Sequence, residues 1–356
     1  MRIGWRGALG IALSAVLLAW ALRDVHWVDV QQHLRTTNMP MLALSAIVAT
    51  LCFPLRAIRW RVILDPVVAG LPYGTLWRST AIGMMVNNIV PARAGELARA
   101  YALARDSRRV SFSAAFASLA VDRVFDAFII IVLMLVAMAD PAFPRDSGLS
   151  RSAANWAGSG VLAMLAFLGA LYLVVFFPNR VIALYEGFSR RVAPRFEERG
   201  RDALLAFAAG LGVLRSPGRF ATILWWTLLH WLVNALAFWI GFKAVGIDVP
   251  LSAALFVQGL IAIGVALPSS PGFFGIWEAI ATQALALYGV ANAQAITWAI
   301  GFHLLSFIPI TVIGGWYFVR LGLHFRDLGK AETGNVSDAE MDEDVQPGST
   351  AGGGAA

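Results

Sequence analysis

Long apolar stretches separated by short polar segments dominate the chain. Six of them roughly meet the requirement of about 20 apolar residues for a helix that crosses a bilayer, with allowance for tilt. The pattern therefore predicts an all-α polytopic membrane protein. Its six full spans are expected near residues 7–22, 39–55, 112–138, 156–177, 220–242 and 293–319.

Two further apolar stretches, residues 73–105 and 251–289, are interrupted. The backbone has no hydrogen-bond partner in hydrocarbon, so a broken helix persists at membrane depth only inside protein or beside a water-filled cavity. Two such breaks in corresponding halves of a membrane protein indicate a transport site. The residues that mark the breaks are Pro91, Gly95, Pro268, Pro271, Gly272 and Gly275.

Basic residues distinguish a straight crossing from a hairpin that enters and leaves on one side. Five clusters hold 21 of the 28 basic residues: the N-terminus, the end of the second span, the first break, residues 180–219 and the end of the last span. The positive-inside rule places such clusters in the cytoplasm. This is satisfied if both broken stretches are re-entrant hairpins, entering from opposite sides. We therefore expect an inverted repeat in the cell (inner) membrane, with both termini cytoplasmic.

Composition supports a membrane protein and separates off the C-terminus. Hydrophobic residues make up 58% of the 356 and charged residues 14%, against roughly 25% charged residues in soluble domains. The formal charge is +6, but residues 327–356 carry seven acidic groups and one basic group, so residues 1–326 carry +12. We expect one transmembrane domain over residues 1–326, with halves of about 1–140 and 141–326. The tail, residues 327–356, is expected to be disordered because it has few large apolar residues.

Motifs for common cofactors are missing from the sequence. Cys52 is the single cysteine, and no Cys/His cluster has the spacing of metal ligands. The sequence also lacks a Gly-rich phosphate loop with Lys and the motifs of serine hydrolases and zinc proteases. We therefore expect no metal, no cofactor, no nucleic-acid partner and no recognisable catalytic constellation.

The first broken stretch contains residues that are suited to bind an anion. A helix that starts near Arg93 would direct free N–H groups and the positive end of its dipole into the membrane. Glu96 and Arg99 are three residues apart and able to pair, and Asn87 and Asn88 add amide groups. The alternative is an interfacial loop whose arginines contact lipid phosphates.

The span that follows carries three charged residues near its centre, Asp122, Arg123 and Asp126. Such charges are expensive in a bilayer and usually face a bundle interior or a cavity. Arg123 and Asp126 can pair within the helix, which leaves Asp122 to pair with another segment or to form a purely structural ion pair. A small and polar stripe at helical spacing supports an inward face: Ser111, Ala115, Ser118, Asp122 and Asp126.

In the second broken stretch, Ser269 and Ser270 can cap the half-helix that follows. Glu278 is the only charged residue of this half-helix. We expect Glu278 to be a counter-ion for a basic group or a proton carrier, and the alternative is that its side chain faces water.

Single polar groups in the other apolar helices are explained by interhelical hydrogen bonds; these are His230, Asn234, Gln258 and His303. The Arg-rich connection 180–219 predicts an amphipathic segment lying on anionic lipid.

Taken together, several motifs resemble one family. They are LRAIRW (residues 55–60), NIVPARAGELAR (88–99), the Asp122–Arg123 pair and PSSPGFFGIWE (268–278). In this order they are similar to the flippase-like transmembrane domain of lysylphosphatidylglycerol synthases, over about residues 5–325. The resemblance implies movement of a lipid between leaflets, with members linked to aminoacylated phospholipid, hopanoid or polyprenyl-linked sugar pathways. The synthase's soluble aminoacyl-transferase domain is missing from this sequence, so synthesis of the lysyl lipid is not implied.

We therefore expect a lipid transporter whose hairpins meet near the midplane around a polar cleft. Asp122 and Glu278 would balance the arginines or receive the amine of an aminoacylated headgroup. The residues expected to hold the headgroup are Arg56, Arg59, Asn87, Asn88, Arg93, Glu96, Arg99, Asp122, Arg123, Asp126, Ser269, Ser270 and Glu278.

Two other functions are compatible with the sequence. One is a scaffold that docks a lipid-modifying or glycosyl-transfer enzyme through residues 180–219. The other is a membrane transferase that uses Glu96 or Asp122 as a base. The sequence does not indicate the identity of the lipid, the energy source or the oligomeric state.

Overall fold

Every regular element in the described part of the chain is a helix. The computed structural model describes residues 27–90, 94–145, 176–192, 216–266 and 270–325, with scattered positions among residues 12–22, 169–174 and 194–205. The helices are α2 (Trp27–Thr36), α3 (Met39–Thr50), α4 (Cys52–Leu64), α5 (Tyr73–Ile89), α6 (Gly95–Asp106), α7 (Phe112–Ala139), α9 (Pro178–Val192), α11 (Pro217–Ala244), α12 (Leu251–Gly264), the 3₁₀ turn η4 (Pro271–Phe273), α13 (Ile276–Ala286) and α14 (Asn292–Arg320).

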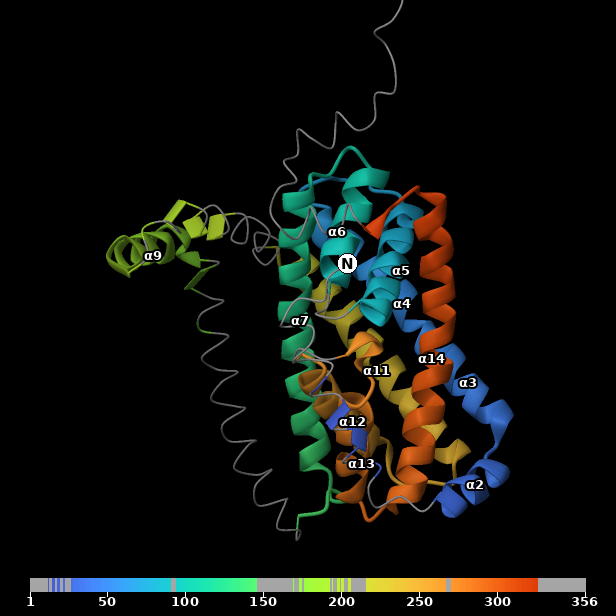
Figure 1. Cartoon of the computed structure of the whole chain (residues 1–356). Coiled ribbons are helices and arrows are strands. Elements are labelled where there is room, and N and C mark those ends of the chain that lie inside the picture. Colours follow the sequence, from blue (N-terminus) through green and yellow to red (C-terminus); the bar gives the residue numbers. More distant parts are fainter. Residues whose placement is uncertain are drawn as a thin grey trace, which may run out of the picture.

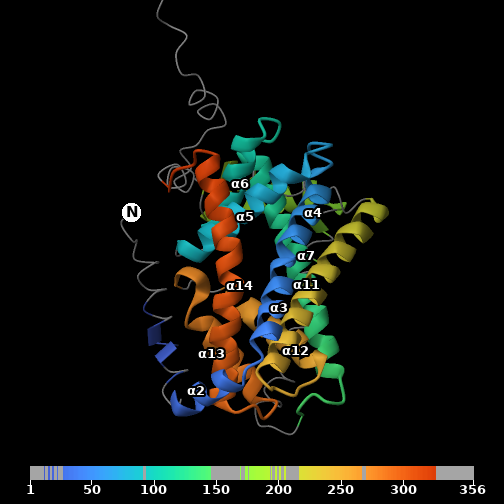
Figure 2. The same ribbon diagram turned by 90° about the vertical axis from the view of Figure 1, so that its right-hand side faces the viewer.

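The long helices form the frame of the molecule. Figure 1 shows α7 and α14 running along opposite sides, and Figure 2 shows α3 continuing into α4 beside α11. Three stretches are long and apolar enough to cross a membrane: Met39–Leu64, Pro217–Ala244 and Asn292–Arg320. These and α7 confirm four of the six predicted helices. The other two, near 7–22 and 156–177, and the acidic tail fall largely or wholly outside the described residues.

The surface of these helices is suited to a bilayer. Large apolar side chains of α3 and α14 are exposed, among them Ile47, Val312, Trp316 and Val319, with Val319 78% exposed. Exposed apolar side chains in this number are suited to contact with membrane or protein.

Two of the helices begin at a polar residue that caps them. The Asn38 side chain accepts from the Met41 N–H at the start of α3, and the Ser111 side chain accepts from the Ala114 N–H at the start of α7.

Two shorter helical hairpins fill the space between the long helices. Helices α5 and α6 contact each other and lie in the upper half of the bundle in Figure 1, whereas α12 and α13 contact each other and lie in the lower half. Helix α5 also contacts η4, so the two hairpins meet. The order helix, hairpin, helix occurs twice, as α4 to α7 and as α11 to α14. Each predicted stretch is thus interrupted: α5 ends at Ile89 and α6 begins at Gly95, and α12 ends at Gly264 and α13 begins at Ile276.

The backbone of the second break has glycine where the chain turns. Gly272 and Gly275 have φ angles of +65° and +92°, a left-handed region that glycine enters without steric penalty. Helix α13 begins directly after Gly275. Pro91 and Pro268 lie outside the described residues.

One prediction about the loops is wrong. Arg56 and Arg59 do not belong to a cytoplasmic loop after the second span, because α4 continues to Leu64 and both side chains are buried. Arg99 is buried as well. All three arginines belong to the basic clusters that the positive-inside rule assigned to the cytoplasm, because the sequence does not show that Asp122 and Asp126 on α7 lie beside them.

The contact of α14 with α5 depends on a glycine. A Cβ atom at Gly314 would collide with the Ala81 carbonyl oxygen and would come within 2.5 Å of the Met85 Cβ, whereas a Cβ at the adjacent Gly315 would meet nothing within 4 Å. Small residues of this kind allow membrane helices to approach closely.

This pair of glycines gives a matched test of the packing. We expect Gly314→Ala to destabilise the protein by about 1–3 kcal/mol through overpacking. Gly315→Ala is expected to be neutral or to stabilise by up to about 1 kcal/mol, because Ala favours the helix. Thermal unfolding of the two purified variants in detergent measures the difference, and equal unfolding temperatures would contradict the α5–α14 contact.

Candidate functional site

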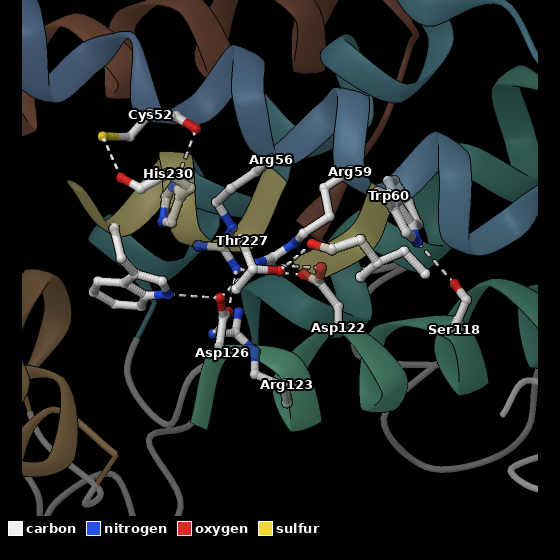
Figure 3. A network of polar contacts seen from close by, with 12 residues as sticks. Cys52, Arg56, Arg59, Trp60, Ser118, Asp122, Arg123, Asp126, Thr227 and His230 are labelled. Carbon is white, nitrogen blue, oxygen red and sulfur yellow. Dashed lines mark hydrogen bonds and ion pairs between the residues drawn. The ribbon is translucent and has the colours of Figure 1, made fainter. Parts of the chain in front are cut away.

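Charged side chains from three helices meet inside the upper half of the bundle. Helix α4 contributes Arg56 and Arg59, α6 contributes Arg99, and α7 contributes Asp122 and Asp126. Each of these side chains is at most 8% exposed. Figure 3 shows the α4 and α7 side chains pointing toward one another. We call this set the buried charge cluster.

Arg59 lies at the centre of the cluster and has no exposed surface. Its Nη2 atom is 2.6 Å from Asp122 Oδ1, and its Nη1 atom donates to Asp126 Oδ1 at 2.6 Å. Asp122 and Asp126 are four residues apart, so they lie on one face of α7 and bracket the guanidinium group. Trp231 Nε1 on α11 also donates to Asp126 Oδ1, at 2.9 Å. The three helices α4, α7 and α11 are thus joined by one carboxylate.

Arg99 joins the first hairpin to the same cluster. Its Nη1 atom donates to Asp122 Oδ2 at 3.3 Å, and its guanidinium carbon lies 4.0 Å from the ring centroid of Trp60. The Trp60 Nε1 atom donates to Ser118 Oγ on α7 at 2.8 Å. The predicted inward stripe of α7 is therefore confirmed, and so is the prediction that Asp122 pairs with another segment.

A second ion pair covers the cluster. Glu96 on α6 pairs with Arg123 on α7, and Arg123 also lies 3.5 Å from Asp126 within its own helix. The intrahelical Arg123–Asp126 pair was predicted. The expected Glu96–Arg99 pair is replaced by interhelical pairs, because the neighbouring α7 offers each of these side chains a partner of opposite charge.

Arg56 is the cation that this network leaves incompletely neutralised. Four arginines face three carboxylates once Glu96 and Arg123 are included, so the formal balance is one positive charge. The closest carboxylate oxygens to Arg56 are 3.8 Å away on Asp122 and 3.9 Å away on Asp126. Its Nη1 atom donates to Met84 Sδ at 3.9 Å, and its Nε and Nη2 atoms, like those of Arg59 and Arg99, have no hydrogen-bond partner among the described residues, so the longer distance to the carboxylates is what distinguishes Arg56. A buried cation in this state is suited to bind an anion.

Arg56 also lines a cavity of about 250 Å³. The cavity lies where the two hairpins meet, with walls from α4, α5, α11, α12, α14 and the second break. Its polar lining residues are Arg56, Asn88, His230, Trp231, Asn234, Gln258, His303 and Ser306, and aromatic rings line it as well, including Phe238, Phe273, Trp277, Phe302 and Phe307. The site is therefore a partly polar cavity with one cation in its wall.

Glu278 is buried and pairs with a basic residue of another helix, so it does not face water. One of its carboxylate oxygens accepts from the Gly275 N–H at 2.6 Å, and the other lies 2.6 Å from His303 Nδ1. It thus caps the start of α13, and its partner is a histidine instead of an arginine. The Ser270 hydroxyl donates to the Phe274 carbonyl, so it does not supply the predicted cap.

The asparagines of the first hairpin divide between two roles. Asn87 Oδ1 accepts from the Gly95 N–H at 2.8 Å and closes the hairpin, whereas Asn88 Nδ2 donates to Thr311 Oγ1 at 2.6 Å and lines the cavity. Arg93 and Ser269, both predicted at the site, lie outside the described residues.

Interhelical hydrogen bonds of the other polar residues are confirmed. His230 Nδ1 lies 3.1 Å from the Cys52 carbonyl oxygen, and Asn234 Nδ2 donates to Gln258 Oε1 at 2.9 Å. From the sequence, each of these residues was expected only to form an interhelical hydrogen bond. In the structure, His230, Asn234 and Gln258 line the same cavity as Arg56. No spacing in the sequence indicates this, because the residues lie on different helices.

The cluster predicts a strong dependence of stability on its carboxylates. We expect Asp122→Asn to destabilise the protein by about 3–5 kcal/mol, because Arg59 and Arg99 would remain buried without a full counter-charge. The matched control is Asp106→Asn, which breaks the Arg78–Asp106 pair between α5 and α6, where Arg78 is 33% exposed. That change is expected to cost about 1 kcal/mol or less. Thermal unfolding in detergent compares the two, and similar losses would show that the cluster does not stabilise the bundle.

Comparison with known proteins agrees with the architecture. Residues 7–314 match the family described as Lysylphosphatidylglycerol synthase TM region. Glycosyltransferase AglD of Haloferax volcanii is 28% identical over 342 residues, which cover 86% of this chain and 53% of AglD. The chain therefore spans about half the length of AglD.

Two relatives are nearer to this chain in length. A UPF0104 membrane protein of Methanothermobacter thermautotrophicus is 25% identical over 319 residues, covering 87% of this chain and 94% of the relative. A UPF0104 membrane protein of Pyrococcus horikoshii is 20% identical over 336 residues, covering 86% and 93%. The resemblance seen in the sequence motifs is confirmed. With its apolar helices and a match that extends over most of its length, this chain is a membrane protein and belongs to the lysylphosphatidylglycerol synthase TM region family.

Proposed function

We propose that this protein moves an anionic lipid between the two leaflets of the cell (inner) membrane, in the manner of a flippase. The observation that carries the proposal is Arg56, a buried cation in the wall of a cavity between two helical hairpins, whose nearest carboxylate oxygens lie 3.8 and 3.9 Å away. Ionisable groups inside membrane segments are expensive, and they usually mark the pathway of a substrate.

The hairpins support transport because of where they meet. In our proposal α5–α6 and α12–α13 are re-entrant and enter the bilayer from opposite sides, with both termini in the cytoplasm. The tips then enclose the headgroup near the midplane while the acyl chains stay in lipid. Secondary transporters bind their substrates at such discontinuous helices, and the contact between α5 and η4 is consistent with this arrangement.

The charged residues then have separate roles. Arg56 binds the phosphate of the headgroup from the cavity wall. Arg59, Asp122 and Asp126 hold α4 against α7, which fixes the backbone that carries Arg56. Asp122 is enclosed by arginines and does not line the cavity, which weighs against its use as a catalytic base. We therefore propose a transporter without enzymatic activity of its own.

A role beside a glycosyl-transfer enzyme is the second candidate. It is favoured by the relation to AglD, whose name describes a glycosyltransferase and which is nearly twice as long as the matched region. In that case, this membrane domain would work with a lipid-modifying enzyme. The amphipathic helix α9, with Leu184 75% exposed and Arg190 beside Glu186, is a suitable contact for lipid or for such a partner.

The test of transport is the substitution Arg56→Gln. The lost charge-assisted hydrogen bonds correspond to about 1.5–3 kcal/mol, so we expect lipid movement in proteoliposomes to fall by roughly 10- to 100-fold. A leaflet-resolved assay with a fluorescent phosphatidylglycerol measures the rate. The unfolding temperature should not fall, because Arg56 is the surplus cation of the cluster.

Arg61→Gln is the matched control, because Arg61 lies on the same helix and is exposed. We expect it to retain the wild-type rate. Undiminished transport by a well-folded Arg56→Gln protein would reject the proposed headgroup site. An absence of lipid movement in the wild type, together with a lipid-modifying partner that co-purifies through residues 180–219, would favour the scaffold.

A further inference from the structure

We propose that the cavity selects a lipid headgroup that carries a phosphate and neutral hydrogen-bonding groups, and that it discriminates against a headgroup with an ammonium group. This inference rests on the proposed function and specifies its cargo. It departs from the expectation that Asp122 or Glu278 receives the amine of an aminoacylated lipid.

The first observation is the charge of the cavity wall. Arg56 is its only Arg or Lys, and no Asp or Glu lines it among the described residues. The undescribed connections 91–93 and 267–269 join α5 to α6 and α12 to η4, and their sequences contain Arg93 but no carboxyl group. An ammonium group that enters this cavity therefore meets a cation and no anion in the wall.

The second observation is that the nearby carboxylates already have partners. Asp122 and Asp126 are turned to Arg59, each with an oxygen 2.6 Å from that guanidinium group. Both oxygens of Glu278 are occupied by the Gly275 N–H and by His303, and Glu278 is 1% exposed. These three carboxylates are at most 3% exposed, so a lipid amine could reach one of them only if the side chains around it rearranged.

The third observation is the supply of neutral polar groups. Asn88 donates one amide hydrogen to Thr311, and Asn234 donates one to Gln258. A side-chain amide has two N–H donors and a carbonyl acceptor, so each of these three amides can also bind the hydroxyl groups of a polyol. All three line the cavity.

Aromatic rings are the remaining way to bind an ammonium group. The Trp277 ring is stacked on the His303 ring at 4.7 Å between centroids and 24° between planes, and on Phe302 at 13°. These rings contact one another instead of forming an open cage. Binding of an amine by the rings is therefore an outcome that the experiment has to distinguish.

The experiment compares phosphatidylglycerol with lysyl-phosphatidylglycerol of the same acyl chains in proteoliposomes of the full chain. The two lipids share the phosphate and the glycerol, and they differ in the lysyl group. We expect the wild type to move phosphatidylglycerol at least about tenfold faster, since the repulsion between two cations at short range in a low dielectric is sufficient for this ratio. Thermal stabilisation of the purified protein by short-chain forms of both lipids gives an independent measure of binding.

A designed carboxylate tests the cause of the selectivity. Gln258→Glu keeps the shape of the side chain and its acceptor for Asn234, and it adds a negative charge to the cavity wall. We expect it to reduce the preference to about threefold or less. Asn292→Asp, at the exposed start of α14, adds the same charge outside the cavity and should leave the preference unchanged.

The outcomes separate this inference from the transport proposal. Equal movement and equal binding of both lipids by the wild type would overturn the selectivity while transport stands, and would show that the aromatic rings accept the amine. Movement of neither lipid would reject both. The wild-type comparison does not depend on the folding of any variant.

Discussion

The structure depends on the ion pairs that Arg59 makes with Asp122 and Asp126. A guanidinium group with no exposed surface is unfavourable in a bundle surrounded by lipid, and two carboxylates on one face of α7 make its burial possible. The same carboxylates receive Arg99 from the first hairpin and Trp231 from α11. Four helices are therefore joined by one group of charges: rotation of α4, α6 or α7 would leave a buried ion unpaired, and rotation of α11 would break the hydrogen bond from Trp231.

The positive charge in the cavity wall results from the way the buried charge cluster is paired. Arg59 and Arg99 lie within 2.6 and 3.3 Å of the aspartates, and Arg56 is left at 3.8–3.9 Å from them. The positive charge of Arg56 therefore faces the cavity, whereas the other three arginines and the three carboxylates of the cluster balance one another. In the proposed function, Arg59 stabilises the bundle and Arg56, three residues earlier on the same helix, binds the anion, which is why substitutions at Arg56 and at Asp122 are expected to have different effects.

The broken helices place polar groups where a continuous helix would not. At the second break, two glycines with positive φ let the chain turn, and Glu278 accepts from the N–H of Gly275, the N-cap of α13, and contacts His303 at the cavity wall. At the first break, Asn87 performs the equivalent task for Gly95. Each hairpin tip is closed by its own side chain, so the remaining polar groups, such as Asn88 and Gln258, are left to line the space between the tips.

The sequence by itself determined the helical class, the positions of the four long helices that the structure describes and the interruptions within residues 73–105 and 251–289, because apolar run length, proline and glycine act over a few neighbouring residues. It also indicated that Asp122 must find a partner outside its own helix, since a charge at mid-span cannot face lipid. Only the tertiary structure decided which partners the charges take. Glu96 and Arg99 are correctly spaced for an intrahelical pair, yet α7 offers each of them an opposite charge at closer range, and Glu278 pairs with His303 from a helix 25 residues further along the chain. Such choices depend on distances between helices, and no local pattern encodes them.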